Sequence, residues 1–328
     1  MNRCEMTHGT DVEQLQAELV DACSWGEEDR AREVVSRFGA EPRARAVLEA
    51  MLEDPDALVR QAAVFGLGVL GGSASARRLE QQLALEEARE DYDGDSVVEA
   101  IIRALGRIED ADAWGALVRK LERLAASGPE PRDVNLVATA LWKRRHPDLL
   151  PILRRSLDRM DPKDWGLLEG LHVLLEKTPD ALHAWACDSL VPVERKTRVV
   201  TVLDADLPPV LAATLPSFIS AASLLVEQAV NQEGDASRYC DRLFSLLLLY
   251  REEVFSSFPE EVRIELRTLA RRLVASVDPS CSLGAAVVLK YVGQPEDAAL
   301  LDAHRPAEPA LAKVFDEASR ALRGPPRG

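Results

Sequence analysis

The chain has 328 residues and a formal net charge of −15. Hydrophobic residues make up 47% of it and aromatic residues only 5%, so alanine and leucine build the core, which suits helix packing better than a sheet. The acidic excess disfavours nucleic-acid binding, because phosphate contacts need concentrated positive charge.

The cysteines and the N-terminus indicate a reducing compartment. Five scattered cysteines form no Cys-x-x-Cys pair, which is typical of reduced thiols. The first residues lack an apolar stretch, so no signal peptide is evident. Leu207–Val226 is uncharged and long enough to span a bilayer, but three prolines interrupt it, so we expect a buried turn and helix there. These features predict a cytoplasmic protein.

The first predicted elements lead to one well-capped helix. We expect residues 1–10 to be disordered or loosely docked, and residues 11–53 to form three short helices that make an N-terminal cap and first repeat. Asp54 is suited to the N-cap of the next helix, with Pro55 at its first position. Gly71-Gly72 supplies a left-handed stop.

This capped helix carries an apolar stripe that recurs along the chain. Val97–Ile108 aligns without a gap with Val59–Leu70, offset by 38 residues, and places Leu105-Gly106 on Leu67-Gly68. Further copies end at Leu141, Leu171 and Leu289. A unit of roughly 30–40 residues that holds two helices is the signature of an α-solenoid.

The remaining segments fit the same array. Prolines mark helix starts at regular intervals, as at Asp161-Pro162 and Thr178-Pro179. Residues 193–234 are the least regular, residues 309–322 read as a capping helix, and residues 323–328 as a frayed tail. No break demands a second domain, so we expect one continuous array over residues 11–322, with the repeats over 54–304.

The segments Asp54–Gly72 and Ser282–Leu301 resemble bacterial HEAT repeats, of the short HEAT-like type described in phycobilisome lyases. The resemblance implies an all-α fold: a right-handed α-solenoid, or superhelix, of about eight helical pairs. It also implies a non-catalytic scaffold or adaptor that binds another protein on its concave face. An assembly factor and an immunity protein that neutralises a toxin both fit this expectation.

An acidic stretch is the first candidate contact for a partner. Residues 1–130 contain 15 Lys or Arg and 27 Asp or Glu, which favours a basic partner. The expected contact residues in the predicted linker are Glu86, Glu87, Glu90, Asp91, Asp93 and Asp95. Three of these aspartates have the spacing of a calcium loop, but Ser96 and Ile102 replace the required glycine and glutamate. We therefore expect no metal.

A second candidate surface combines tryptophans with arginines. Its expected contact residues are Trp142, Arg144, Arg145, Arg155, Trp165 and Trp185. Aromatic side chains among cations resemble the lesion-binding surface of HEAT-like alkylpurine DNA glycosylases. An enzyme of that type, or a chromophore-lyase-like one, is therefore the alternative function.

No sequence motif assigns catalytic residues. The chain has no Gly-x-Ser-x-Gly, no phosphate-binding glycine loop and no His-Glu-x-x-His. None of its five histidines precedes a glutamate, as the metal ligands of HEAT-type hydroxylases do. We expect no cofactor, no nucleic-acid partner and no membrane partner.

Overall fold

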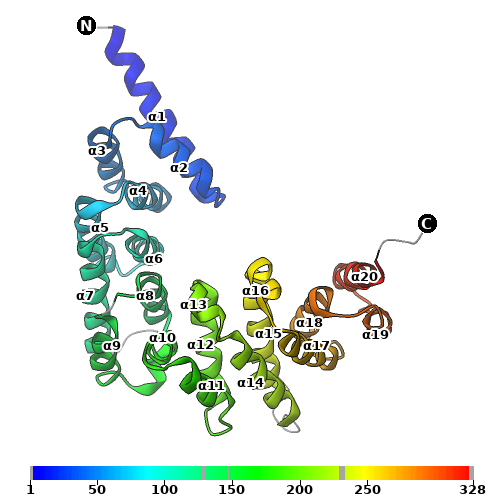
Figure 1. Cartoon of the computed structure of the whole chain (residues 1–328). Coiled ribbons are helices and arrows are strands. Elements are labelled where there is room, and N and C mark those ends of the chain that lie inside the picture. Colours follow the sequence, from blue (N-terminus) through cyan, green and yellow to red (C-terminus); the bar gives the residue numbers. More distant parts are fainter. Residues whose placement is uncertain (1–2, 128–130, 147, 229–232, 325–328) are drawn as a thin grey trace. The chain divides into compact units, whose positions relative to one another are not determined.

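The computed structural model describes residues 3–127, 131–146, 148–228 and 233–324, and every regular element in them is a helix (Figure 1). The all-α prediction is confirmed. The chain divides into two compact units, Met1–Trp165 and Gly166–Gly328. The single continuous array expected over residues 11–322 stays a prediction.

The first unit contains nine α-helices and a short 3₁₀ helix among its described residues. These are α1 (Arg3–Ser24), α2 (Glu28–Arg37), α3 (Glu41–Met51), α4 (Ala57–Leu70), α5 (Gly72–Glu87), α6 (Tyr92–Arg107), α7 (Ala111–Ser127), α8 (Pro131–Arg144), α9 (Leu149–Leu157) and η1 (Pro162–Asp164). Helix α1 begins at Arg3 rather than at residue 11.

The start of α4 differs from the expected one by two residues. Asp56, not Asp54, is the N-cap, and its carboxylate accepts a hydrogen bond from the Leu58 N–H at 2.8 Å. The Asp54 carboxylate instead accepts from the Asp56 N–H, also at 2.8 Å. Both aspartates are suited to the N-cap. The turn that the Asp54 side chain forms with the Asp56 N–H places the start of the helix two residues later. The predicted stop is confirmed, because Gly71 and Gly72 both have positive φ.

The helices of the first unit form two layers. Helices α4, α6 and α8 contact one another in succession, and α5, α7 and α9 do the same beside them (Figure 1). A Cβ atom on Gly68 would lie 3.1 Å from the Ala104 Cβ, and one on Gly106 would lie 3.0 Å from the Ala140 Cβ. The recurring Leu-Gly pair thus marks a close approach between successive helices of this layer.

A buried ion pair joins the two layers at α4 and α5. The Arg60 guanidinium donates to both carboxylate oxygens of Glu86, at 2.8 and 3.1 Å, and neither side chain reaches solvent. Arg60 also donates to the Asp54 and Pro55 carbonyls, and Gln82 donates to Glu86 at 2.7 Å. Because these hydrogen bonds compensate the buried charges, the pair fixes how α4 packs on α5.

The second unit continues the same helical pairing. Its helices are α10 (Gly166–Glu176), α11 (Pro179–Cys187), α12 (Val193–Ala205), α13 (Pro209–Ala212), α14 (Leu215–Gln228), α15 (Glu233–Leu249), α16 (Arg251–Ser257), α17 (Glu260–Leu273), α18 (Pro279–Val292), α19 (Asp297–Ala303) and α20 (Pro309–Arg323). Helices α10, α12, α15, α18 and α20 contact one another in succession, and α11, α14 and α17 form a second row. Residues 325–328 of the predicted tail lie outside the described residues.

Polar side chains in the second unit close the ends of preceding helices. Lys196 donates to the Asp188 carbonyl at 2.8 Å, and Ser282 donates to the Val274 carbonyl at 2.7 Å. Arg263 donates to the Phe255 carbonyl at 3.1 Å. These carbonyls lie in the last turn or at the C-cap of a helix, where no backbone donor is available within the helix.

The segment 209–228 is long and apolar enough to cross a membrane by length and composition. The structure divides it into α13 and α14, with Ala213 and Thr214 between them. Leu215, Phe218 and Ile219 of α14 are fully buried, and α14 packs on α11, α15 and α17. The packed helix expected here is therefore confirmed in α14, but the turn before it is not buried, because α13 has no buried residue and Val210 is 78% exposed.

Candidate partner-binding groove

Two adjoining hollows lie on the α4, α6 and α8 layer of the first unit. The larger, of about 660 Å³, lies over α6 and α8. The smaller, of about 240 Å³, is lined from α1, α2, α4 and α6. Arg103 and Arg107 line both. We call the two hollows together the inner groove.

The inner groove is lined by equivalent positions of successive helices. Alignment of Leu67, Leu105 and Leu141 places three sets of side chains at matching points, one from each of α4, α6 and α8. Two sets line the groove in full, Gln61, Glu99 and Asn135, and Phe65, Arg103 and Thr139; of the third set, Arg107 and Lys143 line it and Val69 does not. The repeat therefore presents a ladder of variable side chains on a constant backbone arrangement, which is how solenoids build extended binding surfaces.

The inner groove is basic although the protein is acidic. Its charged lining residues are the cations Arg103, Arg107, Arg132 and Lys143 and the carboxylates Glu28 and Glu99. The side chains of Arg103 and Arg132 are 64% and 57% exposed, so both guanidinium groups are accessible to a ligand. The groove carries an excess of two positive charges in a unit where acidic residues outnumber basic ones.

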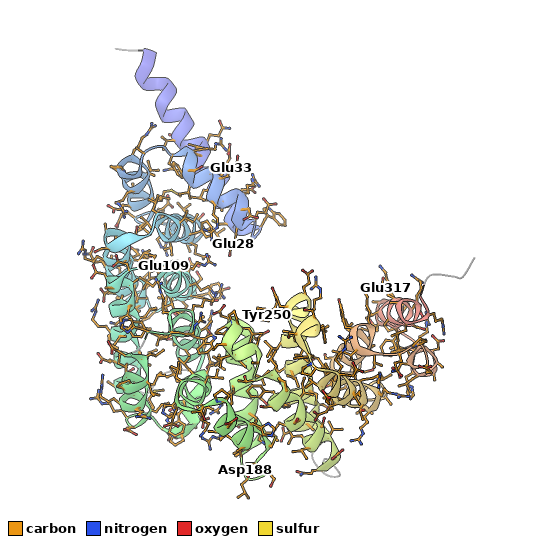
Figure 2. The ribbon with its side chains drawn as sticks, in the orientation of Figure 1. Glu28, Glu33, Glu109, Asp188, Tyr250 and Glu317 are labelled. Atoms are coloured by element: carbon orange, nitrogen blue, oxygen red, sulfur yellow. The ribbon has the colours of Figure 1, made fainter. Side chains whose placement is uncertain are left out.

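Two carboxylates of the chain itself partly neutralise these arginines. Glu99 forms ion pairs with Arg103 on the same helix and with Arg132 on α8, the latter at 2.5 Å. Hydrogen bonding to Glu99 raises the pKa of the Arg132 guanidinium. Glu28, which Figure 2 labels on α2 beside α4, pairs with Arg107 at 2.9 Å. The arginines are thus already positioned to hold carboxylates.

An aromatic ring lies at the α4 end of the groove. The guanidinium carbons of Arg32 and Arg107 lie 5.9 and 5.8 Å from the centroid of the half-buried Phe65 ring. This distance is within the range of a cation–π interaction. The ring therefore helps to hold Arg107 at the surface that both hollows share.

Two acidic side chains of the first unit pair with cations across the layer of α5, α7 and α9, which we call the outer layer. Arg119 on α7 donates to both carboxylate oxygens of Glu80 on α5, at 2.6 and 2.7 Å. Lys120 and Arg123 pair with Glu87 in the same way, at 2.7 and 3.3 Å. Glu80 and Glu87 are therefore paired within the fold, although these pairs leave the net acidic excess of residues 1–130 unchanged.

The predicted acidic linker is shorter than expected, because α5 extends to Glu87 and α6 begins at Tyr92. Glu86 is buried on Arg60 and cannot contact a partner, and Glu87 is paired with α7. Asp91 caps α6 by accepting from the Gly94 N–H at 2.6 Å. The exposed members are Glu90, in the turn, the cap Asp91, and Asp93 and Asp95 in the first turn of α6.

The predicted tryptophan and arginine surface does not form as one patch. The Trp142 ring is 1% exposed, so it cannot stack on a ligand. Arg145 lies over that ring at 5.3 Å, and burial lowers the pKa of the half-buried Arg144. Trp165 donates from Nε1 to the Leu157 carbonyl at 3.1 Å.

The other two members of that predicted surface lie on other helices. Arg155 is exposed on α9, and the half-buried Trp185 lies on α11 in the second unit. Each residue of the predicted surface is thus explained by packing, by a helix end or by solvent exposure, and the structure brings only Trp142 and Arg145 into contact.

A separate cluster of reactive side chains lies in the second unit. His183 on α11 is 3.1 Å from the Ser217 hydroxyl, and its other ring nitrogen is 4.0 Å from the Cys187 sulfur. Burial raises the pKa of the Cys187 thiol and lowers the pKa of the nearby Lys196 ammonium. A raised thiol pKa opposes thiolate formation, so this pair lacks the activation of a nucleophile. No group of metal-ligating side chains occurs among the described residues.

Sequence reasoning missed the inner groove, although its signal was present. The 38-residue offset already placed Arg103 at the position of Phe65, and Arg107 at that of Val69. Only the packing shows that these positions face a hollow. No family model matches the chain, and no curated protein is similar to it in sequence, so the groove is interpreted from its own geometry.

Proposed function

We propose that this chain is a cytoplasmic, non-catalytic scaffold or adaptor of the HEAT-like type, which binds a segment of another protein in the inner groove. The observation that carries this proposal is the groove itself. Three successive helices contribute side chains from equivalent repeat positions to two adjoining hollows. A surface of this kind is suited to an extended ligand that crosses the helices.

The helix contacts support the finer proposal of a right-handed α-solenoid. Within each unit, alternate helices contact in succession and form rows. The Leu-Gly pair provides the close approach twice in the first unit. This recurrence of one packing contact is what repeated HEAT-like pairs require, and it supports the resemblance of Asp54–Gly72 to those repeats.

The enzymatic alternative has less support. A lyase-like or glycosylase-like activity was expected to use the surface between Trp142 and Trp185. The burial of Trp142 removes the ring that would stack on a base. A partner-binding role therefore accounts better for the side chains that are exposed.

The test uses a bulky substitution in the groove. Thr139 lines the larger hollow, and tryptophan at this position would fill part of it. Full-length wild-type protein is used to isolate partners from the cells that make it, and each partner is then purified and titrated. We expect Thr139→Trp to weaken binding at least about tenfold, or about 1.4 kcal/mol.

The matched control places the same bulk on the outer layer. Ala84 is exposed on α5, so Ala84→Trp should leave the affinity unchanged. Equal affinities for wild type and Thr139→Trp, in protein that keeps its helical circular dichroism, would show that partners bind elsewhere.

A further inference from the structure

We infer that the inner groove takes an acidic, extended segment of the partner, and that Glu99 competes with this segment for Arg103 and Arg132. The inference rests on the proposed function and specifies the chemistry of the ligand. The partner segment is therefore expected to be acidic, whereas the composition of residues 1–130 favoured a basic partner.

Charge complementarity determines the ligand class. The lining of the groove contains four cations and two carboxylates, whereas residues 1–165 as a whole contain 23 Lys or Arg and 32 Asp or Glu. Positive charge is thus concentrated where the surface is hollow. Lys143 has no carboxylate within ion-pair distance among the described residues. A carboxylate of a bound segment would supply that partner.

Glu99 occupies the place that such a carboxylate would take. It lies between Arg103 on α6 and Arg132 on α8 and pairs with both. Its side chain is 21% exposed, less than either arginine. Loss of its charge would leave two exposed guanidinium groups without this internal anion, and an external carboxylate would then bind them more tightly.

The geometry of the groove favours a short peptide over nucleic acid. Crossing from α4 to α8 covers two interhelical steps of about 8–10 Å, which about six extended residues span. A nucleic acid would extend its phosphates beyond the groove over an acidic surface, where repulsion opposes binding. An acidic peptide carries its charge only where the cations lie.

The experiment measures fluorescence anisotropy of labelled peptides on the full-length chain. The probe alternates Glu and Ala over about 12 residues, which is long enough to cross the groove at either register. Peptides with Gln or Lys in place of Glu, and a single-stranded oligothymidylate of similar length, are compared with it. We expect the Glu peptide to bind most tightly, and its affinity to fall as NaCl is raised to about 0.5 M.

Two opposite charge changes test the role of Glu99. Glu99→Gln should tighten binding of the Glu peptide by about two- to fivefold, and Lys143→Glu should weaken it by at least as much. The matched controls carry the same changes on exposed outer positions. Glu122→Gln on α7 and Arg155→Glu on α9 should each change the affinity by less than about twofold.

Several results would overturn the inference. They are an unchanged or weaker affinity in Glu99→Gln, tighter binding of the Lys peptide or the oligothymidylate, and equal effects of Lys143→Glu and Arg155→Glu. The thermal midpoint of each variant is measured first, and if Lys143→Glu has lost its cooperative transition it is replaced by Lys143→Gln, which should also weaken binding of the Glu peptide.

The bulky variant separates this inference from the proposed function. Where Thr139→Trp abolishes binding of a natural partner while the charge variants leave it unchanged, the groove binds proteins but not through carboxylates. Where Thr139→Trp has no effect on that partner, the proposed function fails as well.

Discussion

Charged side chains inside this protein hold helix ends and helix pairs. Arg60 joins two carbonyls before α4 to the Glu86 carboxylate on α5. Lys196 donates to the carbonyl of Asp188, the C-cap of α11, which Figure 2 labels. Lys196 thus satisfies a carbonyl that the end of a helix leaves without a donor, whereas the carbonyls that Arg60 reaches belong to the loop before α4. Contacts within the fold therefore account for both buried charges.

One carboxylate is unfavourably placed and gives a pH-dependent prediction. Burial, with a contribution from the nearby Asp278, raises the pKa of Asp241 above its ordinary value of 3.8. Asp278 is itself fixed as the N-cap of α18, where it accepts from the Ser280 N–H at 3.0 Å. The folded state therefore holds the Asp241 proton more tightly than the unfolded chain does.

The sign of the effect follows from proton linkage. Stability falls as pH rises from about 3.8 through the raised pKa of Asp241, because the folded state disfavours the ionised carboxylate. We therefore expect Asp241→Asn to raise the thermal midpoint at pH 7, with the gain vanishing below pH 3.8, where both states are protonated. Asp235→Asn, an exposed change on the same helix, serves as the control and should not stabilise.

At the scale of the elements, the Leu-Gly pair sets the distance between successive helices. The Cβ of any residue at position 106 would lie 3.0 Å from the Ala140 Cβ and 3.1 Å from the Ala140 Cα. The second of these contacts is backbone, so α6 and α8 cannot separate locally without moving the whole helix. Glycine is retained there because the layer has no room for a side chain.

This contact predicts the effect of filling it. We expect Gly106→Leu to destabilise the protein by about 1–3 kcal/mol, the usual cost of overpacking, in urea unfolding followed by circular dichroism. Gly115→Leu on α7 is the control, because its Cβ would meet only the Arg119 side chain. That variant should be neutral or gain up to about 1 kcal/mol from helix propensity. Equal losses in both would contradict the packing explanation.

At the scale of the whole molecule, the chain has two compact units, each with its own buried apolar side chains. We expect a destabilising substitution in the core of one unit to raise local unfolding mainly within that unit. Glu86→Ala leaves the Arg60 charge buried without its partner, which costs about 3–5 kcal/mol. Hydrogen exchange should then accelerate in α4–α7, while α17–α20 keep their protection.

The control for this experiment lies on the same helix. Glu80 forms a partly exposed pair with Arg119, so Glu80→Ala should cost less than about 1 kcal/mol and leave exchange nearly unchanged. Acceleration across both units in Glu86→Ala would show that the chain opens as one cooperative body instead.

The sequence by itself determined the helical architecture, because periodicity and capping are local. The apolar stripe of residues 58–69, the Gly71-Gly72 stop and the repeated Leu-Gly pair predicted helices where the structure has them. The first residue of a helix was less predictable. Asp54 and Asp56 are both suited to the N-cap of α4, and the hydrogen bonds of the folded turn decide between them.

The candidate site was decided by tertiary structure. Composition could count the acidic residues, but it could not show that Glu86 is buried on Arg60 or that Glu87 joins α7. Nor could it show that Trp142 lies in the core while Arg103 and Arg132 line a hollow. Helix packing sets which face of each repeat remains open, and this depends on contacts between residues more than thirty positions apart. The sequence alone therefore predicts the repeat, and only its packing identifies the basic groove.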